Sequence, residues 1–195
     1  MVLTFSVLAM RRTFSAICLA LTVTLQGCAT TRFNAELFDA HLDAPYTLGG
    51  GDRLRVIVYG QDSLSNSYSV DGAGNISMPL IGVVHAQSQT TQALARTIES
   101  RLRAGFLRDP KVSVEVEAYR PFYILGEVGT AGQYPFVSGM TVQTAVAIAG
   151  GFSARAARDY AVITRVIDGS PITGKVPITH PVRPGDTIAL RERFF

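Results

Sequence analysis

Short stretches in which apolar and polar side chains alternate are the feature that most limits how this chain can fold. Leucine or valine recurs at alternate positions in RLRVIV, residues 53–58, and in VSVEVEA, residues 112–118: Leu54, Val56 and Val58, then Val112, Val114 and Val116. A repeat of two residues places these side chains on one face of a β-strand. Further strands are expected at residues 68–70, 76–80, 122–125, 134–136, 162–166 and beyond Asp186. DGAGN separates the first two of these strands, and this glycine turn predicts a hairpin.

Two segments have helical spacing instead. Three apolar residues fall four apart and share one face of a helix: Leu94, Ile98 and Leu102. That helix is expected from about residue 92 to residue 104, with Thr90 or Thr91 as its cap. A shorter helix is expected from its cap Thr141 to about Ala149, where a Gly-Gly pair stops it.

The order of these elements divides the chain into four parts. Residues 1–27 have the pattern of an export signal, residues 28–45 that of a polar, lipidated tether, and residues 46–118 and 119–195 form two compact units. Each unit holds strands and a helix, so the predicted fold class is α+β, with two small domains in tandem. PGDTIAL near the C-terminus echoes GGDRLRV in the first unit, which indicates a recurring way to begin a strand.

The N-terminus has the pattern of a secretory signal. An arginine pair at residues 11–12 precedes a short apolar run, residues 14–25, that cannot span a bilayer, and Met10 is an expected alternative start. The run ends in LQGC, which resembles the lipobox of bacterial lipoproteins. This resemblance implies that Cys28 carries the lipid, palmitate included. Ala29 after it implies an outer-membrane location facing the periplasm.

Removal of an export signal would also account for most of the excess positive charge and for one of the two cysteines. The chain has 18 basic and 15 acidic residues, but without the arginine pair of the signal the balance is 16 to 15. The main argument for a nucleic-acid partner is thereby removed. Cys18 would leave with the signal and Cys28 would be acylated, so no disulfide is expected in the mature protein.

The glycine-rich run from Tyr123 to Gly151 is the stretch that most suggests a nucleotide site. A P-loop needs lysine and then serine or threonine after its glycines, and a dinucleotide loop needs two glycines one residue apart. Neither condition holds, because Gly126, Gly129 and Gly132 are spaced by three. These glycines are expected in the tight turn of a hairpin, and no cofactor is predicted.

Groups for catalysis or metal binding are sparse. Glu115 and Glu117 share an exposed strand face, but the carboxylates of a glycosidase flank the sugar from opposite sides. The histidines lack the spacing of metal ligands: His41, His85 and His180. Three aspartates lie beside glycines and are expected to cap backbone amides in turns: Asp52, Asp71 and Asp186. No catalytic residue and no metal site are predicted.

Two longer stretches resemble a known family. YTLGGGDRLRVIVYG, YSVDGAGNISMPLIGVVHA and LRDPKVSVEV resemble the polysaccharide export domain. FYILGEVGTAGQYPFVSGMTVQTAVAIAGGF resembles the SLBB (soluble-ligand-binding β-grasp) domain. Together they cover about Tyr46 to the C-terminus, so the chain resembles the polysaccharide biosynthesis/export family of outer-membrane lipoproteins.

The resemblance implies a ring-forming homo-oligomer, anchored through Cys28, that conducts exopolysaccharide or capsule chains outward. It also implies an inner-membrane co-polymerase or tyrosine autokinase as partner. Capsule exporters of this family carry a C-terminal amphipathic helix that lines an outer-membrane pore. The sequence to Phe195 resembles the shorter members without that helix, so a separate outer-membrane channel is expected.

Two other interpretations stay open at this level. The chain could be a periplasmic lipoprotein that binds a glycan or small ligand without forming a conduit. It could also be a glycan-processing enzyme that uses Glu115, Glu117 or a loop aspartate. The expectation is a transport component and no enzyme.

Overall fold

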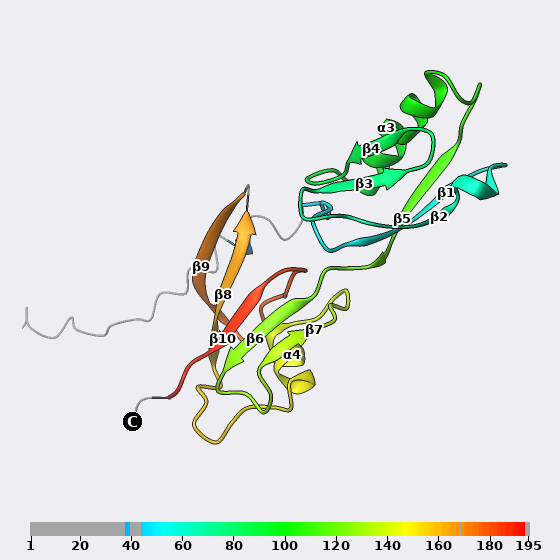
Figure 1. Cartoon of the computed structure of the whole chain (residues 1–195). Helices are drawn as coiled ribbons and strands as arrows, with labels where there is room; N and C mark the ends of the chain where they lie inside the picture. The colour runs from blue at the N-terminus through cyan, green and yellow to red at the C-terminus, as the bar shows by residue number, and fades with distance from the viewer. Residues whose placement is uncertain (1–37, 40–43, 168, 194–195) are drawn as a thin grey trace, which may run out of the picture. The chain divides into compact units, whose positions relative to one another are not determined.

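The computed structural model describes residues 38–39, 44–167 and 169–193. Within these ranges the chain forms ten strands, a 3-10 helix and helices α3 and α4, all in one compact unit (Figure 1). In chain order they are β1 (Arg53–Val58), η1 (Asp62–Leu64), β2 (Asn66–Ser69), β3 (Asn75–Met78), β4 (Gly82–His85), α3 (Thr91–Arg103), β5 (Val112–Ala118), β6 (Phe122–Gly126), β7 (Gly132–Tyr134), α4 (Val142–Ile148), β8 (Tyr160–Ile167), β9 (Ser170–Pro177) and β10 (Thr187–Leu190).

The first half of the chain is organised around β1. This strand lies at the centre of an antiparallel sheet of order β2-β1-β5, and its leucine and valines are buried as the alternation predicts. Helix α3 buries its expected apolar face in the same core: Leu94, Ile98 and Leu102. The side chain of Thr90 caps the helix by accepting a hydrogen bond from the backbone N–H of Ala93 at 3.2 Å.

The hairpin expected between residues 68–70 and 76–80 is wrong. Strand β2 pairs with β1, whereas β3 pairs with β4 in a separate two-stranded sheet. The glycine turn itself is present, because the Asp71 carboxylate accepts N–H bonds from Ala73 and Asn75. A turn sequence fixes the local bend of the chain, but it does not decide which strands then pair.

The second half forms a five-stranded sheet of order β7-β6-β10-β8-β9. Strand β10 lies between β6 and β8, parallel to β6 and antiparallel to β8 (Figure 1). The expected β6–β7 hairpin and the Thr141 cap of α4 are both confirmed, the cap as a reciprocal pair with Thr144. Gly150 and Gly151 follow the helix with positive φ. The fold is α+β with two domains in tandem, as the sequence predicts.

Phe38 precedes the first domain in sequence, but its side chain packs in the core of the second domain. It lies within residues 28–45, the expected tether, yet its side chain is 0% exposed and packs in the cluster that holds Phe122 and Ile188. Its ring meets the His180 ring edge-on at 5.9 Å between centroids. This aromatic side chain is therefore part of the C-terminal domain's core. Among the described residues no helix has the length and hydropathy needed to cross a membrane.

Candidate functional site

The similar sequences GGDRLRV and PGDTIAL form the same kind of turn, one in each domain. Asp52 donates its backbone N–H to the carbonyl of Gly49 at 3.1 Å, and its Oδ2 accepts from the Gly49 N–H at 2.8 Å. Asp186 does the same with Arg183, at 3.1 and 2.7 Å. The glycine before each aspartate has a φ of +93° or +85°, which other residues rarely adopt. The predicted capping role of the aspartates, Asp71 included, is confirmed.

Asp52 is the centre of a buried hydrogen-bond cluster. Its two carboxylate oxygens accept from the Tyr46 hydroxyl at 2.8 and 2.6 Å, and Oδ1 also accepts from the backbone N–H of Arg120 at 2.8 Å. Burial raises the pKa of the Tyr46 hydroxyl far above its usual value, and the bond to Asp52 raises it further. Tyr46 therefore stays a neutral donor.

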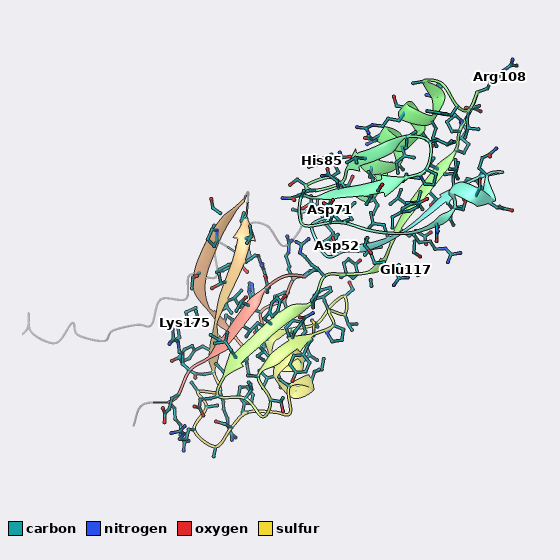
Figure 2. The ribbon with its side chains drawn as sticks, in the orientation of Figure 1. Asp52, Asp71, His85, Arg108, Glu117 and Lys175 are labelled. Atoms are coloured by element: carbon teal, nitrogen blue, oxygen red, sulfur yellow. The ribbon has the colours of Figure 1, made fainter. Side chains whose placement is uncertain are left out.

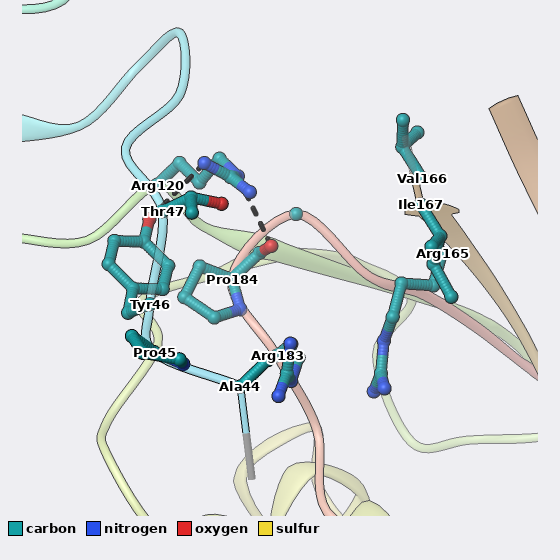
Figure 3. A pocket seen from close by; sticks show the side chains of 11 residues that line it. Ala44, Pro45, Tyr46, Thr47, Arg120, Arg165, Val166, Ile167, Arg183 and Pro184 are labelled. Carbon is teal, nitrogen blue, oxygen red and sulfur yellow. Dashed lines mark hydrogen bonds between the residues drawn. The ribbon is translucent and has the colours of Figure 1, made fainter. Parts of the chain in front are cut away.

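The Arg120 side chain joins the two aspartate turns. Its Nη1 lies 3.4 Å from Oδ2 of Asp52 and 3.2 Å from the Tyr46 hydroxyl. Its Nε donates to the carbonyl of Pro184 in the second turn at 3.1 Å (Figure 3). One guanidinium thus contacts a turn from each domain.

Arg165 holds the second turn through a buried ion pair. Its Nε and Nη2 bind the two carboxylate oxygens of Asp186 at 2.9 and 2.8 Å, the side-on geometry that favours arginine over lysine. Nη2 also donates to the carbonyl of Pro181 at 3.1 Å, and the guanidinium carbon lies 5.4 Å from the centre of the Phe38 ring. The remaining nitrogen, Nη1, is buried without a hydrogen-bond partner.

A cavity of about 260 Å³ opens beside these turns. Figure 3 shows the side chains of Arg120, Arg165 and Arg183 around it. Its described lining includes no carboxylate, because both aspartates lie behind the wall. Burial lowers the pKa of Arg183 and the nearby Arg165 guanidinium lowers it further, while Asp186 raises it. Three arginines therefore belong to the described lining of the cavity.

His180 is buried next to this cluster. Its Nδ1 lies 3.6 Å from a carboxylate oxygen of Asp39, and its Nε2 is buried without a partner. Burial lowers the pKa of His180 and Arg165 lowers it further, which outweighs the opposing effects of Asp39 and Asp186. The ring is therefore neutral at pH 7.

This buried histidine predicts acid sensitivity. In the unfolded chain His180 takes up a proton near pH 6.5, whereas the folded protein resists protonation until the pH is lower. The contribution of neutral His180 to the free energy of unfolding is therefore complete above pH 6.5. It falls as the pH drops from there to the folded pKa, by at most about 1.4 kcal/mol per pH unit. Urea titrations of His180→Gln should show a shallower loss between pH 7.5 and 5.5. His85→Gln, at an exposed histidine, is the control, and equal slopes in all three proteins would contradict the assignment.

The predicted glutamates do not form a catalytic pair. Glu115 and Glu117 lie on the exposed face of β5. Glu117, which is labelled in Figure 2, forms an ion pair with Nε of Arg53 at 2.9 Å. His85 is exposed and bonds to Asn75. In the described part of the chain, no three His, Cys, Asp or Glu side chains come together as metal ligands would. Cys28 and His41 lie outside the described residues.

The arginines of the cavity were missed in the sequence. One signal could have indicated Arg165, which occupies an inward-facing position of β8 where Ala161 and Ile163 lead one to expect another apolar side chain. A charge at such a position implies a buried partner. No local pattern shows that the partner is Asp186, or that Arg120 reaches both turns.

Two family descriptions match the chain in tandem. The polysaccharide biosynthesis/export protein model matches residues 40–117, and the SLBB domain model matches residues 121–176. The chain therefore contains a polysaccharide biosynthesis/export domain followed by an SLBB domain. The resemblance found in the sequence is confirmed, as are the identities of both domains.

The chain is similar to proteins named for exopolysaccharide production and for polysaccharide export. It is 38% identical over 132 residues to the exopolysaccharide production protein ExoF of Rhizobium meliloti (strain 1021), which covers 59% of this chain and 31% of that protein. It is 31% identical over 114 residues to the EPS I polysaccharide export outer membrane protein EpsA of Ralstonia solanacearum, covering 46% of this chain and 30% of that protein. The matches thus span about a third of the length of these relatives.

Proposed function

We propose that this chain is a lipid-anchored, periplasmic subunit of a polysaccharide export machine at the outer membrane. The observation that carries the proposal is the tandem match to the export and SLBB domains in that order. The relatives named for exopolysaccharide production and export support the same role. Its part in the machine is to help form a ring through which the polymer passes.

The described surface suits guidance of a polymer better than capture of a small molecule. A chain that must slide needs many weak polar contacts and no deep pocket that would hold one unit. The cavity at the aspartate turns, at about 260 Å³, is smaller than the roughly 300 Å³ at which pockets for drug-sized ligands begin. A homo-oligomer with cyclic symmetry would repeat these surfaces around the path of the polymer.

The proposed machine has further parts. A polymer made at the inner membrane must be delivered to this subunit, which is the expected role of a co-polymerase or tyrosine autokinase. It must then cross the outer membrane, and we assign that step to a separate channel. Neither step makes or breaks a bond, so no enzymatic activity is proposed for this chain.

The anchor and the export role can be tested in one deletion strain. Wild-type protein should restore polymer secretion, label with palmitate and migrate as an oligomer in detergent. Cys28→Ala should lose the label and leave the membrane fraction, because several acyl chains at about 0.8 kcal/mol per buried methylene supply the attachment. Cys18→Ala, in the apolar run of the signal, is the matched control and should behave as wild type.

The outcomes separate the parts of the proposal. Unchanged secretion in the deletion strain, together with a monomer in detergent, would refute the conduit role. A Cys28→Ala protein that still labels with palmitate would refute only the site of the anchor.

A further inference from the structure

We propose that the C-terminal domain binds a second copy of this chain head to tail. The outer face of its sheet would lie against the exposed side of helix α4 in the next copy. This inference rests on the proposed function, because it names the surfaces that would close the proposed ring. The two faces lie on opposite sides of one core, in which α4 packs against the inner residues of β6, β8 and β10.

The outer face of the five-stranded sheet carries almost no charge. Buried and outward side chains alternate along β6, β8 and β10, and these strands lie side by side with β9 at the edge (Figure 1). Among the outward residues of these four strands, which lie wholly within the described ranges, the only charged one is Lys175. Its Nζ lies 3.3 Å from the centre of the Tyr160 ring. Large apolar side chains on this face are open to water, and they include Tyr123, Leu125 and Val166 at 44%, 46% and 65% exposed.

The opposite side of the domain is also poor in charge. Between Glu127 and Arg155 the sequence has no charged residue, although 17% of the residues in the whole chain are charged. Helix α4 lies within this stretch and turns Ala147 and Ile148 away from the core. Ile148 is 49% exposed, and Val137, in the loop that leads into the helix, is 61% exposed. Exposed apolar side chains without charges among them are typical of the centre of a protein interface.

The N-terminal domain provides an internal comparison. It also pairs a sheet with one helix, but both of them expose charges, including Arg53, Arg55, Glu115 and Glu117 on the sheet and Arg96 and Arg101 on α3. Surfaces that stay in water are usually charged in this way. The low charge of the C-terminal faces is therefore not a general property of this chain, and it indicates that an assembly covers them.

Two such faces on opposite sides of one domain favour a second copy as the occupant. A different protein would need only one of them and would leave the other in water. When the outer sheet face of one copy meets α4 of the next, both faces are covered in every copy. This contact is heterologous, the kind that repeats around a ring, whereas a face that paired with itself would give a two-fold contact.

Chemical cross-linking of the full chain in detergent tests this contact. Removal of the signal and acylation of Cys28 leave no free thiol in the proposed mature protein, so only introduced cysteines can react. The double variant Leu125→Cys/Ile148→Cys places one thiol on each face at exposed positions. A bismaleimide with a flexible spacer joins thiols without the strict geometry of a disulfide. It should produce a ladder of linked dimers, trimers and larger species.

Two controls accompany this double variant. Each single variant should stay monomeric on a denaturing gel, because residue 125 of one copy faces residue 148 of the next and not its own equivalent. Glu115→Cys/Arg96→Cys places thiols on the exposed sheet and helix faces of the N-terminal domain and should also stay monomeric.

Charge added to either face should weaken the oligomer. Leu125→Glu and Ile148→Lys should each raise the dissociation constant at least about tenfold in sedimentation experiments, because an unpaired charge enters a desolvated contact. The two changes together should restore most of the affinity, since the opposite charges then meet across the interface. Both positions are exposed within one copy, so the far-UV circular dichroism spectra should match that of the wild type.

Each contrary result has its own meaning. Linked dimers from a single variant would show a two-fold contact and overturn the head-to-tail assignment. A double variant that stays monomeric, an equal ladder from the N-terminal pair, or charge variants that assemble as wild type would overturn the inference. Secretion lost in the deletion strain without linked product would refute this inference alone, whereas a ladder without any secretion defect would refute only the proposed function.

Discussion

Replacing Asp186 with alanine is expected to destabilise the protein by about 3–5 kcal/mol, the usual cost of removing one partner from a buried ion pair. Arg165 would be left as a buried cation without its carboxylate, since the two side chains are only 5% and 1% exposed. The backbone N–H of Arg183 would lose its acceptor as well. Because domains of this size are stable by only about 5–15 kcal/mol, the variant should unfold at markedly lower urea concentration.

Two comparisons isolate the cause of that loss. Asp71→Ala removes the same kind of turn cap at an exposed position and should cost only about 1 kcal/mol. The double variant Asp186→Leu/Arg165→Met removes both charges and should recover much of the stability, because apolar groups of similar size can replace a buried pair. If Asp71→Ala and Asp186→Ala were equally destabilised, the ion pair would contribute nothing beyond the turn.

The aspartates show how far the sequence alone could go. Their place beside glycines predicted the capping of backbone amides, because both partners of such a bond lie within a few residues. The same holds for the Thr141 cap, for the cap of α3, which was expected at Thr90 or Thr91, and for the buried faces of β1 and α3. These features depend on spacing along the chain, and spacing is what a sequence displays directly.

Long-range choices could not be read in this way. The β2–β3 hairpin was wrong because β2 pairs with β1 and β3 pairs with β4, and the turn sequence between β2 and β3 does not decide which strands pair. The arginine cavity was missed for a related reason. Its members come from distant parts of the chain. Arg120 bonds to Tyr46, 74 residues before it, and to Pro184, 64 residues after it, and nothing local links them. The family resemblance supplied the domain identities but not this site.

Phe38→Ala is expected to cost about 3–5 kcal/mol, the usual loss when a buried phenylalanine is truncated in a core. The ring is 0% exposed and packs with Phe122 and Ile188, so its removal leaves a cavity in the second domain. It would also remove the aromatic surface beneath Arg165 and beside His180. Hydrogen exchange should show the loss of protection in β10 and α4, not in α3.

The control is Phe106→Ala, which removes the same side chain from a position that is 52% exposed and should change the free energy of unfolding by less than about 0.5 kcal/mol. A difference between these variants would mean that a residue only ten positions after Cys28 stabilises the C-terminal domain, although the first domain lies between them in sequence. The proposed lipid anchor would then lie only ten residues before a core residue of the domain that contains Arg165. Equal stability of the two variants would show that Phe38 does not belong to that core.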